Sequence, residues 1–275
     1  MGDATVEEQI RVRFHGNEGP TVIVLHGGPA APGSAAPLAR GLAGAFRVLE
    51  PWQRGSGEEP LTVARHIADL HEVVLSCGFA RPALVGESWG AMLALAYAAA
   101  HPESAGPLTL VGCGTFDAAA RAQIGATLEA RTSPELRRLL ERIPEEIPDP
   151  LAQMARRYEL THSLYDYDPH PPEPDTESLP PFDLRAHTET WNDMIRLQEA
   201  GVYPATFAAI RSPVLMLHGA YDPHPGQMIR NSLLPFLPHL EYREWKRCGH
   251  RPWAERHVRD DFFATLREWL SRHLR

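Results

Sequence analysis

The apolar and polar positions of the chain follow two alternating patterns. Short apolar runs, several of them rich in β-branched residues, predict strands buried on both faces of a sheet. These runs lie at 21–25, 46–49, 83–85, 107–111 and 213–217. Residues 9–14 alternate between apolar and charged, as a half-exposed edge strand does, and 240–245 predicts a further strand.

Segments with a helical spacing of apolar residues separate these runs. They predict helices at 37–45, 91–100, 226–237 and 253–273, and another from an N-cap at Thr62 to about Cys77. The 91–100 segment is apolar all round, which indicates a helix inside the protein. Strands that alternate with helices predict an α/β fold, with a mostly parallel sheet covered by helices on both faces.

The pattern changes between residues 114 and 209. Helical segments there alternate with proline clusters, and 166–181 is rich in both proline and acidic residues. A structureless loop of that length is uncommon inside a compact domain, so we interpret the segment as an inserted helical lid with an exposed acidic linker. We therefore expect a core made of residues 1–113 and 210–275, and a lid at 114–209.

A serine lies where the 83–85 run meets the apolar helix, within Gly86-Glu87-Ser88-Trp89-Gly90. A sharp strand-to-helix turn holds such a serine in a strained backbone conformation, and the flanking glycines let the strand and helix pack closely. The hydroxyl is then exposed at a helix start, where free N–H groups favour developing negative charge. This context predicts Ser88 as a nucleophile.

A serine hydroxyl needs a neighbouring base that is oriented by a third group. His250 follows the 240–245 strand and Asp222 follows the 213–217 strand. Both therefore emerge at the carboxyl ends of strands, where open parallel sheets place their sites. We expect Ser88, His250 and Asp222 to form a catalytic triad. Asp117, which follows the 107–111 strand, is the alternative acid.

Attack on a carbonyl also requires hydrogen-bond donors for the oxyanion. The backbone N–H of Trp89, the residue after the nucleophile, is the first candidate. The second is the N–H of Gly28, within His26-Gly27-Gly28-Pro29 after the 21–25 strand. We interpret His26 as a structural histidine that fixes this loop.

These motifs resemble the proline iminopeptidase branch of the α/β-hydrolase fold. The resemblance covers 20–112 and 210–275, and it rests on His26-Gly27-Gly28-Pro29, Gln53-Arg54-Gly55-Ser56-Gly57, Gly86-Glu87-Ser88-Trp89-Gly90, Leu93-Ala94-Leu95-Ala96-Tyr97 and His101-Pro102. It implies that fold and the release of an N-terminal residue, usually proline, from small peptides. It also implies Ser88, His250 and Asp222 as the catalytic residues.

Two features of the family bear on the substrate, and this chain matches them incompletely. The family usually carries an acidic residue before its Gln-Arg-Gly-Ser-Gly motif, where this chain has Trp52. The family's lid glutamates bind the substrate's amino group, and Arg157-Tyr158-Glu159 is similar to one such stretch, so Glu159 is the candidate substrate-binding residue. We expect at least one lid carboxylate to face Ser88. The candidates are Glu159, Asp166, Asp168, Asp183, Glu189 and Asp193.

Composition narrows the choice of partners. The formal net charge is −8 and no basic cluster offsets it, which argues against nucleic acid as a partner. Three cysteines without paired spacing, an N-terminus unlike a signal peptide and no apolar run long enough to span a bilayer favour a cytoplasmic location. We expect a small-molecule or short-peptide substrate, and no cofactor, metal or membrane partner.

The sequence therefore predicts a serine hydrolase that cleaves an ester or amide of a small substrate through an acyl-enzyme. An N-terminal-proline aminopeptidase is one form of this prediction. A carboxylesterase or lactonase is the first alternative, because such enzymes share the same core. A binding protein that keeps the fold without catalysis is the second.

Overall fold

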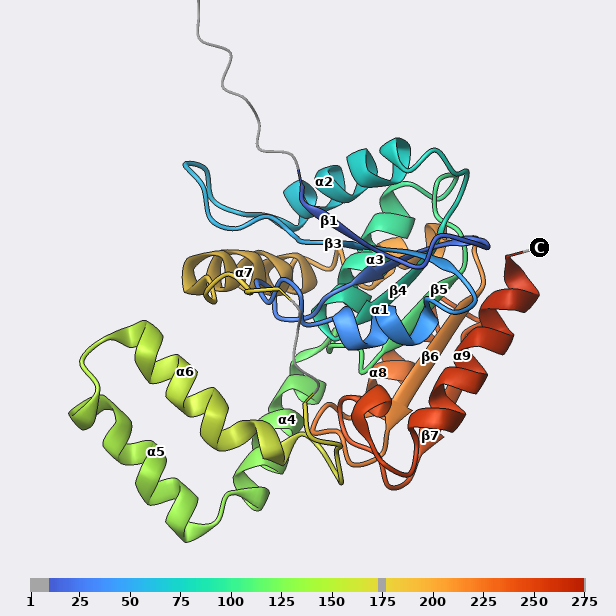
Figure 1. The fold of residues 1–275 in the computed structure, drawn as a ribbon. Helices are drawn as coiled ribbons and strands as arrows, with labels where there is room; N and C mark the ends of the chain where they lie inside the picture. The colour runs from blue at the N-terminus through green and yellow to red at the C-terminus, as the bar shows by residue number, and fades with distance from the viewer. Residues whose placement is uncertain (1–9, 173–176, 275) are drawn as a thin grey trace, which may run out of the picture.

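A single mixed sheet organises the part of the chain that the computed structural model describes, residues 10–172 and 177–274. Its strand order is β1-β3-β2-β4-β5-β6-β7 (Figure 1). The strands are β1 (Val12–His15), β2 (Thr21–Leu25), β3 (Arg47–Pro51), β4 (Ala83–Glu87), β5 (Leu108–Val111), β6 (Val214–Gly219) and β7 (Glu241–Trp245). Only β1 pairs antiparallel with its neighbour, so the expected mostly parallel sheet is confirmed.

Helices cover both faces of this sheet. On one face α1 (Ala36–Leu42) and α9 (Arg259–His273) bury their apolar side chains against β2 and β3. On the other face lie α2 (Val63–Ser76), α3 (Trp89–Ala100) and α8 (Gly226–Leu233). Because β4 and α3 are buried on every side, the turn between them is held rigidly at the carboxyl edge of the sheet.

The predicted helix at 253–273 is wrong at its start. A short 3-10 helix, η3 (Pro252–Ala254), comes first, and α9 begins only at Arg259. Between them Glu255 has an extended backbone, with φ −76° and ψ 124°, which interrupts the helix. Its side chain turns inward and accepts three backbone N–H groups. The predicted helix at 226–237 is likewise shorter and ends at Leu233.

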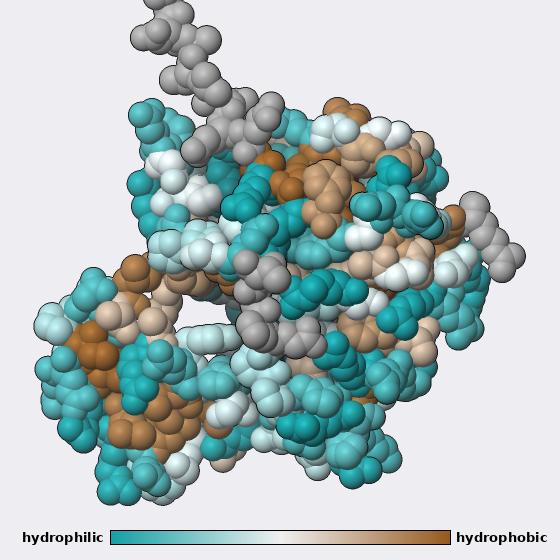
Figure 2. All heavy atoms as spheres, viewed as in Figure 1, coloured by the Kyte–Doolittle hydropathy of each residue, from teal (hydrophilic) through white to brown (hydrophobic). Residues whose placement is uncertain are grey.

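In the described part of the chain, four α-helices lie between β5 and β6: α4 (Ala118–Arg131), α5 (Pro134–Glu146), α6 (Pro150–Thr161) and α7 (Leu184–Glu199). A short 3-10 helix, η1 (His162–Leu164), follows α6, and another, η2 (Ala205–Ala209), follows α7. In Figure 1, α7 runs beside α2, whereas α5 and α6 form a hairpin that projects from the core. Apolar side chains gather along this hairpin, and an open gap separates it from the core (Figure 2).

The chain after η1 is tied to the loop that carries His250. The Tyr165 carbonyl accepts the His250 backbone N–H at 2.8 Å, and the His170 N–H donates to the Ala254 carbonyl at 2.7 Å. Asp166 is buried and forms an ion pair with Arg251, so the expected exposed linker is wrong at this residue. The lid therefore reaches the candidate site through this segment.

Some predictions fall outside the described residues. They concern the N-terminal segment 1–9, residues 173–176 of the acidic stretch and residue 275. Of the helices in the described part of the chain, none combines the length and apolar character needed to cross a membrane.

Candidate active site

Ser88 occupies a strained turn between β4 and α3. Its φ of 51° and ψ of −115° are rare for a residue with a side chain, and its N–H donates to the Val111 carbonyl at 2.8 Å. The flanking glycines are required by space. A Cβ on Gly86 would lie 2.2 Å from the Gly90 carbonyl oxygen, and one on Gly90 equally close to that of Leu25. The strain keeps Ser88 partly exposed while its neighbours are buried.

Asp222 and His250 are in direct contact. The His250 Nδ1 lies 2.7 Å from Asp222 Oδ2, and the Asp222 side chain is fully buried. Burial alone would raise the pKa of Asp222, but the surrounding imidazoles lower it strongly, so the group is a carboxylate. Burial likewise opposes the charged form of His250, but Asp222 outweighs it and raises the pKa of His250. Nδ1 therefore carries the proton, and Nε2 is the nitrogen that can accept another.

The end of β5 links this pair to the nucleophile. Val111 binds the Ser88 amide, and the next residue, Gly112, lies against the His250 ring. A Cβ on Gly112 would come within 3.1 Å of His250 Nδ1 and Cε1, and the φ of +54° at this position also favours glycine. The Ser88 turn and the His250 ring therefore both contact the end of β5, the turn at Val111 and the ring at Gly112.

Asp117, the alternative acid, has a different role. It is the N-cap of α4, and its Oδ1 accepts the Ala120 N–H at 2.8 Å. The carboxylate in contact with His250 is that of Asp222.

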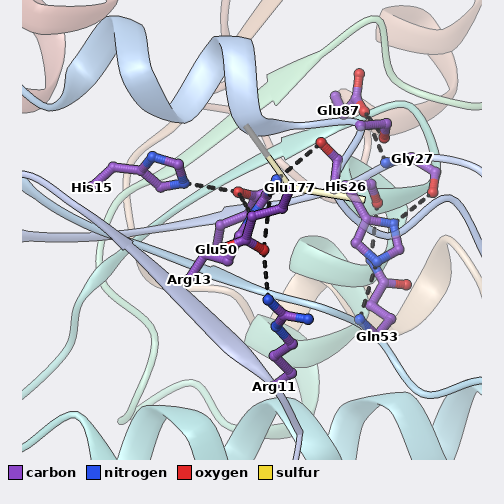
Figure 3. Close-up of polar contacts among 11 residues, drawn as sticks. Arg11, Arg13, His15, His26, Gly27, Glu50, Gln53, Glu87 and Glu177 are labelled. Carbon is purple, nitrogen blue, oxygen red and sulfur yellow. Dashed lines mark hydrogen bonds and ion pairs between the residues drawn. The ribbon is translucent and has the colours of Figure 1, made fainter. Parts of the chain in front are cut away.

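Two backbone amides remain available for an oxyanion. The Gly27 N–H is already bound, because Glu87 Oε1 accepts it at 3.0 Å (Figure 3). Within the described ranges, the amides of Gly28 and Trp89 donate to no acceptor. Gly28 has a φ of +115°, a conformation that side-chain-bearing residues rarely adopt.

A hydrogen-bonded network around His26 fixes the loop that carries Gly28. The His26 Nδ1 donates to the Gly27 carbonyl at 2.8 Å, and its Nε2 accepts the Gln53 N–H at 3.0 Å (Figure 3). The Gln53 side chain donates to the His26 carbonyl and accepts the indole N–H of Trp89. Burial lowers the pKa of His26, so the ring stays neutral and its two nitrogens keep these distinct roles.

A family model described as alpha/beta hydrolase fold matches residues 20–250. The chain belongs to the alpha/beta hydrolase family. The proline iminopeptidase of Neisseria gonorrhoeae is 38% identical over 104 residues, which cover 34% of this chain and 33% of that protein. The matched segment thus spans about a third of that relative's length.

Two further comparisons extend over nearly the whole chain. The proline iminopeptidase of Lactobacillus helveticus is 24% identical over 311 residues, covering 97% of this chain and 95% of that protein. The solved structure of a putative aryl esterase from Burkholderia cenocepacia has a TM-score of 0.66 at 20% identity, covering 96% and 95% of the two chains. The predicted α/β-hydrolase fold and the resemblance to proline iminopeptidases are confirmed.

In this alpha/beta hydrolase, each of the six candidate lid carboxylates already has a partner. Glu159 lies on the exposed surface of α6, with 63% of its side chain exposed, and pairs with Arg156 at 2.9 Å. Three carboxylates at the start of or within α7 bind residues between Ser56 and the start of α2, and two bind the chain around and after His250. The pairs are Asp183 with Ser56, Glu189 with the Leu61 N–H, Asp193 with the Val63 N–H, Asp166 with Arg251, and Asp168 with Arg256.

Trp52, the other departure from the family pattern, lies apart from these groups. Its ring is buried and covered by two guanidinium groups, those of Arg11 at 4.2 Å and Arg13 at 5.2 Å from the ring centroid. Arg13 in turn binds the buried Glu50 carboxylate, which His15 also contacts (Figure 3). The residue before Gln53 therefore belongs to a packed cluster at the β1 edge.

Two residues of the candidate site were not predicted from the sequence. Glu87 is buried and its Oε1 accepts both the Gly27 N–H and, at 2.8 Å, the Ser34 hydroxyl. His224 contacts Asp222 and stacks on His250, with ring centroids 4.6 Å apart. The available signals were a charged residue ending an apolar strand and a histidine two positions after the acid.

Asp222, His224 and His250 each offer one ligand atom within 4.8 Å of the others, close enough for a metal ion. In this structure the two ring Nδ1 atoms instead face the two carboxylate oxygens at hydrogen-bond distance. We therefore assign these side chains to a hydrogen-bonded cluster.

Proposed function

We propose that this alpha/beta hydrolase is a serine hydrolase that cleaves an ester or amide bond of a small substrate through a Ser88–His250–Asp222 triad. The observation that carries the proposal is the short Asp222–His250 contact beside a serine held at φ 51°. A buried carboxylate, an imidazole oriented by it and a partly exposed serine on a strained turn are the parts that acyl transfer requires.

The proposed reaction has two halves. Ser88 Oγ attacks the substrate carbonyl while His250 Nε2 takes the hydroxyl proton, and the Gly28 and Trp89 amides bind the oxyanion. His250 then gives the proton to the departing alcohol or amine, which leaves an ester on Ser88. In the second half a water molecule gives a proton to His250 and attacks this ester, and His250 returns the proton to Ser88 Oγ as the acid product departs.

Of the two substrate classes, we place carboxylic esters and lactones first. An aminopeptidase must hold a protonated amine near the scissile bond, which calls for a carboxylate facing the site. All six lid candidates have other partners, and Glu159 is an exposed helix residue. N-terminal-proline aminopeptidase activity is the second candidate, supported by the proline iminopeptidase relatives.

Labelling with a fluorophosphonate probe tests the nucleophile. Wild-type protein should be labelled, and Ser88→Ala should lose labelling and about 10⁶-fold in kcat, as removal of a triad serine does in a known hydrolase. Ser56→Ala is the matched control, because Ser56 hydrogen-bonds Asp183, and it should label normally. Absence of labelling in the wild-type protein would contradict the proposal and favour the alternative, a binding protein that keeps the fold without catalysis.

A paired assay tests the substrate class. Short acyl esters and lactones should be cleaved with a higher kcat/KM than Pro-naphthylamide, and N-acetylation of the naphthylamide should not lower its rate. A preference for the free amine would overturn this order and establish the aminopeptidase.

A further inference from the structure

The Asp222 carboxylate binds more partners than a triad needs. Its Oδ2 contacts His250 Nδ1 at 2.7 Å, whereas Oδ1 accepts the His224 backbone N–H at 2.9 Å and lies 3.0 Å from His224 Nδ1. A third imidazole supports this arrangement. His218 Nε2 donates to the His224 carbonyl at 2.9 Å and lies 3.3 Å from Asp222 Oδ2.

The protonation of the two stacked rings follows from the acceptor that they share. An ionised carboxylate can only accept hydrogen bonds, so the Nδ1 atoms of His224 and His250 must both be donors. The His224 ring is 15% exposed and lies at 24° to the His250 ring. His224 therefore draws on the same negative charge that stabilises the protonated His250 formed during catalysis.

We propose that His224 is a positioning residue that shares Asp222 with His250 and thereby sets the pH below which Ser88 is no longer activated. The inference rests on the proposed function. Each hydrogen bond donated to the Asp222 carboxylate weakens the attraction of that carboxylate for its other donors. The Nδ1–H of His224 therefore makes protonated His250 easier to deprotonate. Loss of that donor should keep His250 protonated, and hence unable to act as a base, up to a higher pH.

Other charged and titratable groups also face this pair. From the lid, the Tyr165 ring lies 6.1 Å from that of His224 and 5.8 Å from that of His250. Glu87 and Arg251 act electrostatically on His250, and Cys113 and Tyr242 interact with Asp222. A change confined to residue 224 leaves all of these groups in place, so a shift in pH dependence reports on His224.

Two substitutions separate the hydrogen bond from the ring. His224→Phe keeps an aromatic ring to stack on His250 but has no donor. His224→Asn loses the ring, but its amide nitrogen is bonded to Cγ, as Nδ1 is in histidine, and can donate in the same place. The asparagine side chain cannot become charged. His239→Phe is the control, because His239 is an exposed histidine in the loop before β7.

The readout is the rate of fluorophosphonate labelling of Ser88 between pH 5 and pH 9. In His224→Phe we expect the acid limb of the curve of labelling rate against pH to move to higher pH by about half a unit or more. We expect it to stay near the wild-type position in His224→Asn and His239→Phe. Thermal midpoints measured beside these rates identify any variant that has lost its fold.

Three outcomes would count against the inference. If the acid limb of the pH–rate curve does not shift in a folded His224→Phe variant, the inference about His224 is wrong and the proposed triad is unaffected. An equal shift in the Phe and Asn variants overturns it as well, because charge or stacking would then act in place of the donor. A wild-type protein without Ser88-dependent labelling would remove the proposed function and this inference together.

Discussion

Glu87 joins the nucleophile turn to the oxyanion loop through a single oxygen. The residue directly before Ser88, it accepts the N–H of Gly27 and the hydroxyl of Ser34. The fit is close, since a Cβ on Gly27 would lie 3.2 Å from the Ser88 Cβ. The Gly28 amide is thereby placed relative to Ser88 by the Glu87 carboxylate.

Replacement of Glu87 should therefore lower kcat more than it raises KM. Glu87→Ala leaves the Gly27 N–H unpaired and frees the Gly28 amide to move, and loss of one oxyanion donor costs about 10²–10³ in kcat elsewhere. We expect a decrease of about 10-fold to 100-fold, because the amide is displaced rather than removed. Glu87→Gln keeps an acceptor oxygen and should recover most of the activity. Steady-state kinetics on an acyl ester would contradict the idea if both variants behaved alike.

The acid can be tested with a matched pair of substitutions. Asp222→Asn should lower kcat by about 10⁴-fold, as the equivalent change does in a known triad, because the amide favours the wrong tautomer of the histidine. Asp117→Asn should leave kcat unchanged, since asparagine caps a helix as well as aspartate does. Loss of turnover only in the second variant would refute the assignment of the acid.

Residue identities at the site were predictable only where the backbone decides them. Ser88, Asp222 and His250 follow strands, and strand ends are visible in the sequence. The partner of Asp166 was not predictable, since it depends on which arginine the fold brings near the carboxylate. Glu87 and His224 were missed for the same reason: their roles exist only once distant segments meet.

At the scale of elements, a buried histidine joins α2 to α7. His66 in α2 contacts the Thr190 hydroxyl of α7 at 2.9 Å, and burial lowers the pKa of His66 to about 4. In the unfolded chain this group binds a proton near pH 6.5, whereas in the folded protein it does so only near pH 4. The stability that it contributes is therefore complete above pH 6.5 and is lost as the pH falls.

The expected size of this effect is about 3 kcal/mol between pH 7 and pH 4, from a difference of about 2.5 pKa units between the two states. His66→Gln keeps a group that can reach Thr190 but has no such titration. We expect its unfolding free energy, measured in urea, to fall less steeply with decreasing pH than that of the wild type. Parallel pH curves for the two proteins would rule out this contribution. His26 and His218, also buried with lowered pKa values, are common to both proteins.

Most element positions were predictable because their apolar spacing is regular. Thr62 caps α2 as expected, with its side chain accepting the Arg65 N–H. The start of the last helix was not predictable, because Trp253 continues the apolar spacing of α9 without belonging to it. Tertiary hydrogen bonds to Glu255 override the local pattern there.

Across the whole molecule, Glu255 connects the segment after η1 to the loop that carries His250. It is 1% exposed and accepts the backbone N–H groups of Tyr167, Asp168 and Gly249, each at 2.7 Å. Two of these donors belong to the segment after η1, and the third directly precedes His250. One carboxylate thus sets the distance between the lid and the base.

Glu255→Ala should weaken both stability and catalysis. One buried N–H group, that of Gly249, and two partly buried N–H groups would lose their acceptor, and the loss at a buried group costs about 1–3 kcal/mol. We expect a lower thermal midpoint together with slower fluorophosphonate labelling. Glu268→Ala is the control, because Glu268 is an exposed residue of α9. Equal midpoints for the two variants would show that Glu255 does not hold this junction.

The junction also bears on how such a protein can acquire new substrates. In the proposed mechanism, a movement of the segment after η1 would also move the His250 loop, so we expect substitutions in that segment to affect catalysis. The α5–α6 hairpin projects from the core (Figure 1). Apart from Ile143, its side chains are largely exposed. Sequence changes within 132–161 can therefore alter the surface of the hairpin and should leave the proposed Ser88–His250–Asp222 triad in place. A library randomised in the hairpin should retain fluorophosphonate reactivity in most of its folded members.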